Sequence, residues 1–131
     1  MIVRRFFSNF WLIFSFKFSG NVRGLLTTAT FDHEAEEFVL HTPCVEACKF
    51  WVGALGKTAT HAIVMANLII PSHKDKEAKS YGVHAFLVPI RDPDTFYPHN
   101  GVEIWDIGDK MGFKAMDNGM MKFSQYRIPR R

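Results

Sequence analysis

The sequence predicts an all-β protein of the sandwich or barrel kind, and three observations support this. From Leu25 onward, short runs rich in β-branched and aromatic residues alternate with turn residues. No amphipathic stretch of useful helical length, no heptad pattern and no internal repeat is present. The 131 residues suffice for one domain with a core but not comfortably for two. We therefore expect a single β-domain of roughly seven or eight strands.

The expected strands are separated by turns rich in charge, glycine or proline. The longest apolar run ends at Pro71, and its β-branched residues favour a buried strand over a helix. The polar segment 72–80 that follows predicts the solvated tip of a hairpin. The strands that can be assigned are residues 26–31, 37–41, 60–70, 81–90, 102–107 and 120–128.

Residues 1–22 form a leader that differs from the domain expected over 23–131. Six of the 13 Phe residues lie before Gly20. Residues 1–26 carry four basic and no acidic residues, so the net charge of +3 becomes −1 without them. The basic balance thus belongs to the leader, and nucleic-acid binding by the domain is not expected.

The leader has the outline of a secretory signal peptide. It is too short, and too interrupted by Asn9 and Lys17, to cross a bilayer as a helix. Three interpretations stay open: a targeting or anchoring segment, a buried strand or helix of the domain, and unrelated sequence joined at a misplaced gene start. We favour the third.

Metal and nucleophilic sites are not expected. Cys44 and Cys48 are the only cysteines and lack a second pair of ligands, so free, partly buried thiols are expected. The histidines are scattered, and no serine lies in a Gly-x-Ser-x-Gly turn. His61 and His84 lie in apolar runs, which is typical of core histidines.

Three carboxylates surround the glycine-rich turn before the last strand, namely Asp106, Asp109 and Asp117. A paired-carboxylate site is conceivable there. Lys110 and Lys114 lie beside them in the sequence, however, so we expect mutual neutralisation on a surface turn.

Residues 49–70 carry the most informative segment, a glycine-bearing turn followed by the long apolar run. Gly56-Lys57-Thr58 fits the end of a phosphate-binding loop, but Trp51 lies where that motif needs its first glycine. A phosphate loop is therefore rejected. Gly53 and Gly56 allow a backbone to approach a flat ligand closely. Composition leaves open whether Trp51 stacks on such a ligand or fills the core.

Six strings of residues resemble a known family when they are taken in order. They are Leu26-Thr-Thr-Ala-Thr-Phe-Asp32, Glu37-Phe-Val-Leu40, Lys49-x-Trp-x-Gly-x-Leu-Gly-Lys-Thr58 with His61-Ala-Ile-Val64, Gly82-x-His-Ala-Phe-x-Val-Pro-Ile-Arg91, Asp106-Ile-Gly-x-Lys110 with Gly112, and Asp117-Asn-Gly119 leading to Arg127-Ile-Pro-Arg130. From about Arg23 to the C-terminus the chain resembles the middle β-domain of peroxisomal acyl-CoA oxidases, within the acyl-CoA dehydrogenase superfamily.

The resemblance implies a β-domain packed between two helical domains and covering one side of an FAD isoalloxazine. It also implies α,β-dehydrogenation of a fatty acyl-CoA, with electrons passed to O2 to give H2O2, in a peroxisomal homodimer. The cofactor-binding residues that it implies are Trp51, Gly53, Ala54, Gly56, Lys57 and Thr58.

Three departures from the family limit this expectation. Val52-Gly53-Ala54 replaces the usual Pro-Gly-Gly, which adds a Cβ at Ala54 close to the expected ring. The Thr-Glu-x-Gly-x-Gly segment is absent before Arg23, as are the helical domains with their glutamate base. No catalytic residue is assigned, and no C-terminal peroxisomal signal is present.

We therefore expect a fragment that is inactive alone and tends to associate through apolar surface. The alternative is a non-catalytic β-domain, either an interaction module or a secreted degenerate paralogue.

Overall fold

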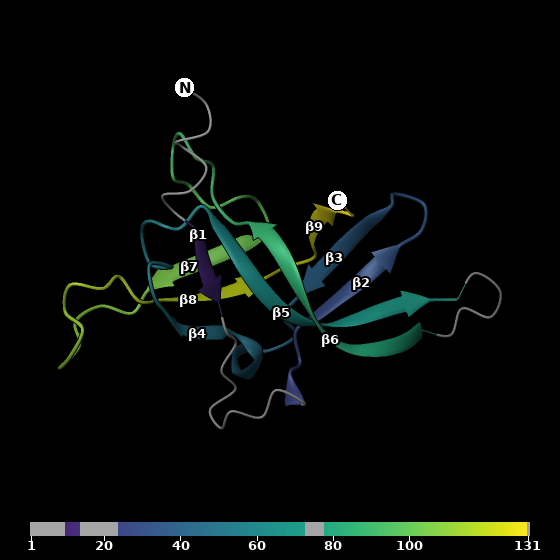
Figure 1. Cartoon of the computed structure of the whole chain (residues 1–131), viewed down its shortest axis with the longest axis horizontal. Helices are drawn as coiled ribbons and strands as arrows, with labels where there is room; N and C mark the ends of the chain where they lie inside the picture. The colour runs from purple at the N-terminus through teal and green to yellow at the C-terminus, as the bar shows by residue number, and fades with distance from the viewer. Residues whose placement is uncertain (1–9, 14–23, 73–77, 131) are drawn as a thin grey trace.

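The computed structural model describes residues 10–13, 24–72 and 78–130, with side chains for the last two ranges (Figure 1). These residues form nine strands and the short 3-10 helix η3 (Val45–Ala47). The strands are β1 (Phe10–Ile13), β2 (Thr28–Asp32), β3 (Glu37–His41), β4 (Lys49–Val52), β5 (His61–Pro71), β6 (Ala78–Pro89), β7 (Val102–Asp106), β8 (Gly119–Phe123) and β9 (Tyr126–Pro129). The all-β prediction is confirmed.

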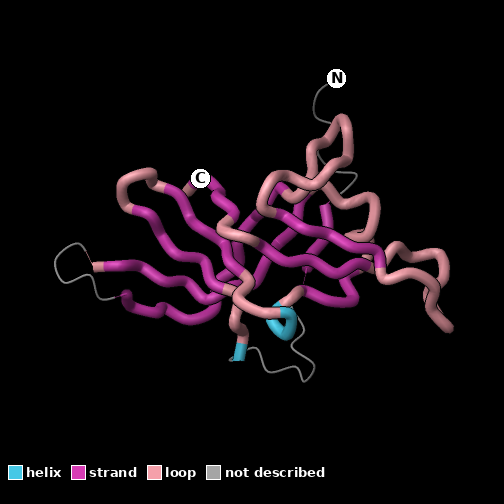
Figure 2. The backbone as a smooth tube through the Cα atoms, turned by 180° about the vertical axis from the view of Figure 1, so that it is seen from behind, coloured by secondary structure: helices cyan, strands magenta, loops and turns pink. Residues whose placement is uncertain are grey.

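The strands form two open sheets, and neither closes into a barrel within the described residues. The larger sheet has the order β1-β5-β2-β3-β9, with β6 on the other side of β5. The smaller sheet has the order β4-β8-β7. The long β5–β6 hairpin runs through the middle of the molecule, with β4, β7 and β8 at one end of the view (Figure 1). Figure 2 shows from behind how loops project beyond the strands at both ends.

Both sheets contribute to one hydrophobic core, so they pack against each other. Alternate residues of β5 are buried, as expected for a strand with one face toward a core. Leu55, in the turn between β4 and β5, is fully buried in the same core. The turn is therefore anchored by an apolar side chain as well as by its ends. Other fully buried residues of this hydrophobic core are Leu40, Val64, Val88, Met121 and Phe123.

The expected single strand over 120–128 is wrong, because the chain breaks there into two strands of different sheets. β8 belongs to the smaller sheet and β9 to the larger. Between them Gln125 has a φ of 51°, and the Ser124 amide donates to the Gly101 carbonyl. Apolar residues lie on both sides of this bend because both strands face the same core, but the alternation of buried residues shifts by one position at the polar pair Ser124-Gln125.

The strand β4 was not expected, since its residues were assigned to a turn. It pairs antiparallel with β8, and the register shifts between Lys49 and Val52. Such a shift marks a β-bulge, which redirects side chains locally. Trp51 lies within this bulge and has a φ of 65°. A short strand with a bulge has no regular period-2 pattern, so no strand could be predicted there.

Lys49 is fully buried between the sheets, which the sequence did not indicate. Its Nζ donates to the Met65 carbonyl of β5 at 2.9 Å, so the side chain bridges the two sheets. Burial lowers the pKa of Lys49 to about 7, because removing the ammonium from water disfavours its charged form.

The expectation of two core histidines is wrong. His61 is half-buried, and its Nδ1 lies 3.1 Å from Thr60 Oγ1. His84 is exposed although it shares a face of β6 with the buried Phe86 and Val88, because the part of the hairpin that carries it lies beyond the buried part of β6. Both cysteines are free thiols as predicted, with Cys44 exposed and Cys48 buried.

Within the leader, the structure describes only β1. This strand pairs in parallel with residues 61–64 of β5, and β2 pairs in parallel with residues 67–69 of the same strand. This pairing fits the interpretation of that segment as a strand of the domain. Residues 1–9 and 14–23 lie outside the described residues, so the division at residue 22 stays a prediction. Among the described residues, no helix is long and apolar enough to cross a membrane.

Candidate functional site

The candidate site is the segment from Trp51 to Thr58, which leaves β4 and turns back into β5. Trp51 is 48% exposed, whereas its neighbour Val52 is buried in the core. The bulge in β4 thus presents the indole at the surface while the next residue anchors the backbone. The Trp51 carbonyl accepts a hydrogen bond from Asn118 Nδ2 at 3.1 Å.

The turn itself is a compact coil stabilised from within. The amides of Thr58 and Ala59 both donate to the Ala54 carbonyl, at 3.2 and 2.8 Å. Ala54 is buried and has a φ of 58°, a left-handed conformation that is strained for any residue with a Cβ. Gly53 stays half-exposed beside Trp51.

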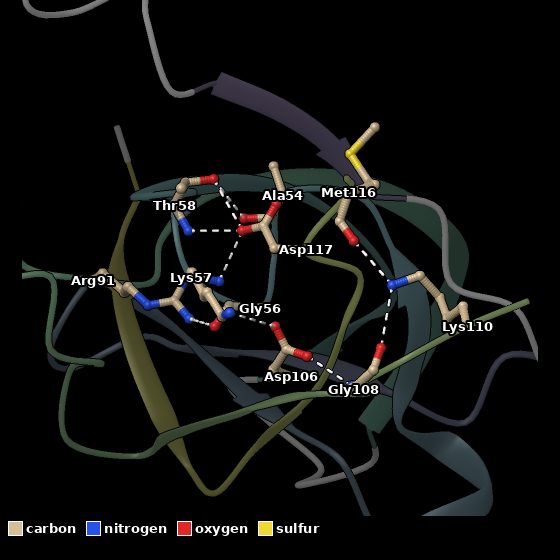
Figure 3. Close-up of polar contacts among 10 residues, drawn as sticks. All are labelled: Ala54, Gly56, Lys57, Thr58, Arg91, Asp106, Gly108, Lys110, Met116 and Asp117. Carbon is tan, nitrogen blue, oxygen red and sulfur yellow. Dashed lines mark hydrogen bonds and ion pairs between the residues drawn. The ribbon is translucent and has the colours of Figure 1, made fainter. Parts of the chain in front are cut away.

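A carboxylate from the loop that precedes β8 closes the turn. Asp117 Oδ2 accepts hydrogen bonds from the amides of Lys57 and Thr58, at 2.9 and 3.1 Å, and from Thr58 Oγ1 at 3.1 Å (Figure 3). The Gly56 amide donates to the Asp117 carbonyl at 2.9 Å. In a phosphate loop, amides of this kind face the ligand. Here they bind a protein carboxylate, which agrees with the rejection of that interpretation.

Arg91 supports the turn from its inner side. Arg91 is 4% exposed, and its guanidinium donates to the carbonyls of Ala59 and Gly56, both at 2.9 Å. Burial lowers the pKa of Arg91, and the charge of Asp117 acts in the opposite direction. An arginine starts from so high a pKa that it stays charged at neutral pH. The turn therefore lies between a buried cation and a half-buried anion.

Two glycines let this segment and the start of β8 approach closely. A Cβ on Gly119 would lie 2.7 Å from the Gly56 nitrogen, and one on Gly56 would lie 2.7 Å from Asp106 Oδ2. Such distances are far inside van der Waals contact, so neither position accepts a side chain without movement. A Cβ on Gly53 would meet only the Met116 side chain, at 3.4 Å.

We expected Lys110 and Lys114 to neutralise the three aspartates, but the structure pairs Lys110 and Asp106 with other groups. Lys110 Nζ donates to the carbonyls of Gly108 and Met116 at 3.3 and 2.9 Å. Asp106 instead lies 3.8 Å from Lys57, an exposed and weak ion pair. The loop folds back on itself, so its lysine meets carbonyl oxygens rather than the neighbouring acids.

Sequence reasoning found the turn but missed most of the residues that hold it. Asp117 and Asn118 lie about sixty residues further along, and Arg91 follows β6. The string Asp117-Asn-Gly119 was a signal, although nothing in its spacing named its partner. Among the described residues, no group of three or more His, Cys, Asp or Glu side chains is placed to hold a metal ion.

Comparisons with known proteins agree on one family. Over 110 residues, 84% of this chain, it is 50% identical to peroxisomal acyl-coenzyme A oxidase 1 of Bos taurus. The chain is homologous to part of the acyl-CoA oxidases. It spans only 16% of the length of the bovine protein. No family model matches the chain.

Solved acyl-CoA oxidase structures show the same fold. Acyl-CoA oxidase-1 of Caenorhabditis elegans, complexed with FAD and ATP, matches with a TM-score of 0.83 at 42% identity, over 92% of this chain and 18% of that one. Acyl-CoA oxidase-2 of the same organism, bound with FAD, ascaroside-CoA and ATP, matches with a TM-score of 0.81 at 44% identity, over 92% and 17%. The predicted resemblance to this family is confirmed.

The geometry of the segment fits a flat aromatic cofactor such as the flavin of FAD. An exposed indole lies beside a half-exposed glycine whose backbone no side chain of its own covers. The predicted cofactor residues do not lie alike, however. Trp51, Lys57 and Thr58 are exposed and Gly53 and Gly56 half-buried, whereas Ala54 is buried. The backbone donors of Lys57 and Thr58 already bind Asp117.

Proposed function

We propose that residues 23–131 form the middle β-domain of an FAD-dependent acyl-CoA oxidase and supply one wall of its flavin and acyl-CoA site. The observation that carries this is the exposed Trp51 beside Gly53, in a turn held between Arg91 and Asp117. The homology to acyl-CoA oxidases supports the assignment.

The reaction is the α,β-dehydrogenation of a fatty acyl-CoA, with electrons passed to O2 to give H2O2. When bound, FAD supplies the hydride acceptor and the reaction with oxygen. The chain's own share is positioning. Trp51 packs against the ring and excludes water from it, and the backbone at Gly53 and Ala54 hydrogen-bonds to it. The remaining predicted residues, Gly56, Lys57 and Thr58, complete the loop along the flavin.

No residue of this chain is proposed as the catalytic base. In the family a glutamate on a helical domain removes the α-proton, and we propose that this domain needs such helical partners for activity. The 131-residue chain alone is then inactive. By analogy with the relatives named peroxisomal, we propose that the complete enzyme acts in the peroxisome, as a homodimer.

A chimeric oxidase tests this proposal. Residues 23–131 replace the homologous residues of the Caenorhabditis elegans acyl-CoA oxidase-1, and FAD content and H2O2 production from a fatty acyl-CoA are measured. We expect FAD at the parent's stoichiometry and turnover above background. A folded chimera without FAD would contradict the proposed flavin wall.

A further inference from the structure

The beginning and the end of the candidate segment are held by one tripeptide, Asp117–Gly119. Asn118 Nδ2 bonds to the carbonyl of Trp51, at the beginning of the segment. Asp117 Oδ2 bonds to two amides and a hydroxyl at its end, on Lys57 and Thr58. The five residues between the two attachments, 52–56, are thereby fixed relative to β8.

The bonds to Asp117 are of the strong kind. Three donors converge on one carboxylate oxygen, and a fourth, the Gly56 amide, meets the carbonyl of the same residue (Figure 3). Hydrogen bonds to an ionised acceptor are about twice as strong as those between neutral groups. A neutral side chain at position 117 would leave the three donors on Lys57 and Thr58 without their charged partner, whereas the Gly56 amide would keep the backbone carbonyl.

The side chain of Asn118, which bonds to the Trp51 carbonyl, is buried. It is 5% exposed, and its Oδ1 is buried with no hydrogen-bond partner among the described residues. Burying an acceptor without a partner costs free energy. An asparagine at position 118 therefore lowers the stability of the fold through its unpaired Oδ1. Its Nδ2 offsets this by fixing the position of the Trp51 carbonyl. Gly119 lies against Gly56 with no room for a Cβ, so the tripeptide cannot shift along the segment.

We propose that Asp117 and Asn118 are positioning residues for the cofactor, which hold Trp51 and Gly53 at the angle that the flavin requires. This inference rests on the proposed function. Both residues bind the Trp51 to Thr58 segment, and both act on the flavin through the backbone of that segment. The rigidity they supply lowers the cost of ordering the segment when FAD binds.

The test compares Asp117→Ala and the milder Asp117→Asn with Asp109→Asn, each in the chimeric oxidase that carries residues 23–131 of this chain. Asp109 is exposed on the neighbouring loop, which makes it a matched loss of one charge. Hydrogen exchange is measured at the amides of Lys57 and Thr58, and FAD affinity by quenching of flavin fluorescence. In Asp117→Ala we expect both amides to exchange about tenfold faster or more, and FAD to bind about tenfold more weakly. Asp117→Asn should lie between, and the control should match the unmodified chimera.

Two results would overturn the inference. One is unchanged exchange at Lys57 and Thr58 in Asp117→Ala. The other is faster exchange combined with the FAD affinity of the unmodified chimera. If exchange accelerates but even the unmodified chimera binds no FAD, the positioning of the segment by Asp117 stands and the proposed function fails. Asn118→Ala gives a second check, since loss of its bond to Trp51 should weaken FAD binding without exposing the Thr58 amide.

Discussion

Replacing Lys49 with methionine should make the stability of this chain less dependent on pH. The ammonium is fully buried, and its pKa is about 7 against an ordinary 10.5. Between these values the unfolded chain binds more protons than the folded one, so the free energy of unfolding rises with pH. Below pH 7 the full penalty for burying the charge is present. Methionine has a similar length and no charge to bury.

The magnitude follows from the two pKa values. Between pH 7 and pH 9 the unmodified chain should gain about 2 kcal/mol from Lys49, and Lys49→Met should lack that gain. Urea unfolding at low protein concentration, followed by tryptophan fluorescence, measures both proteins at both pH values. Lys114→Met, on the exposed loop, controls for the loss of an ordinary lysine. Parallel pH dependence in the unmodified chain and Lys49→Met would refute the reasoning.

Two further substitutions probe the turn. Ala54→Gly should stabilise the chain by about 1 kcal/mol in urea unfolding, because the residue has a φ of 58°; a loss of stability would show that packing of its methyl group outweighs the strain. Gly119→Ala should destabilise the chain by about 1–3 kcal/mol, since its Cβ would lie 2.7 Å from the Gly56 nitrogen. Gly112→Ala, where a Cβ would meet nothing within 4 Å, should leave the melting temperature unchanged, and equal effects of the two would contradict the close approach.

The strands were predictable where alternation is regular. The β5–β6 hairpin combines long apolar runs with a charged connection, and the structure forms it nearly as expected. β4 has no such pattern, because a bulge at Trp51 interrupts it. The bend at Gln125 was missed because apolar residues lie on both sides of it, and its only mark is a one-residue shift in their alternation. Local sequence thus located regular pairing and missed the places where the backbone departs from it.

The sequence indicated which segment forms the candidate site. It did not indicate which of its residues are exposed or which distant residues hold it. Family strings pointed to Trp51 and Gly53, and both lie at the surface of one turn. The burial of Ala54 and the carboxylate of Asp117 beneath the turn depend on how β8 packs against it. A contact across sixty residues leaves no mark in local composition. The same is true of Lys49, whose burial follows from the meeting of two sheets.

The most direct test of the central claim is the FAD affinity of the chimeric oxidase with and without Trp51→Ala. Loss of an aromatic surface that packs on the flavin should weaken FAD binding about tenfold and alter the flavin absorbance spectrum. Trp105→Ala is the matched control, because Trp105 is 39% exposed on β7 and packs against Lys122. It should bind FAD as the unmodified chimera does. An unchanged affinity and spectrum in Trp51→Ala would contradict the claim that this segment is the wall of the flavin site.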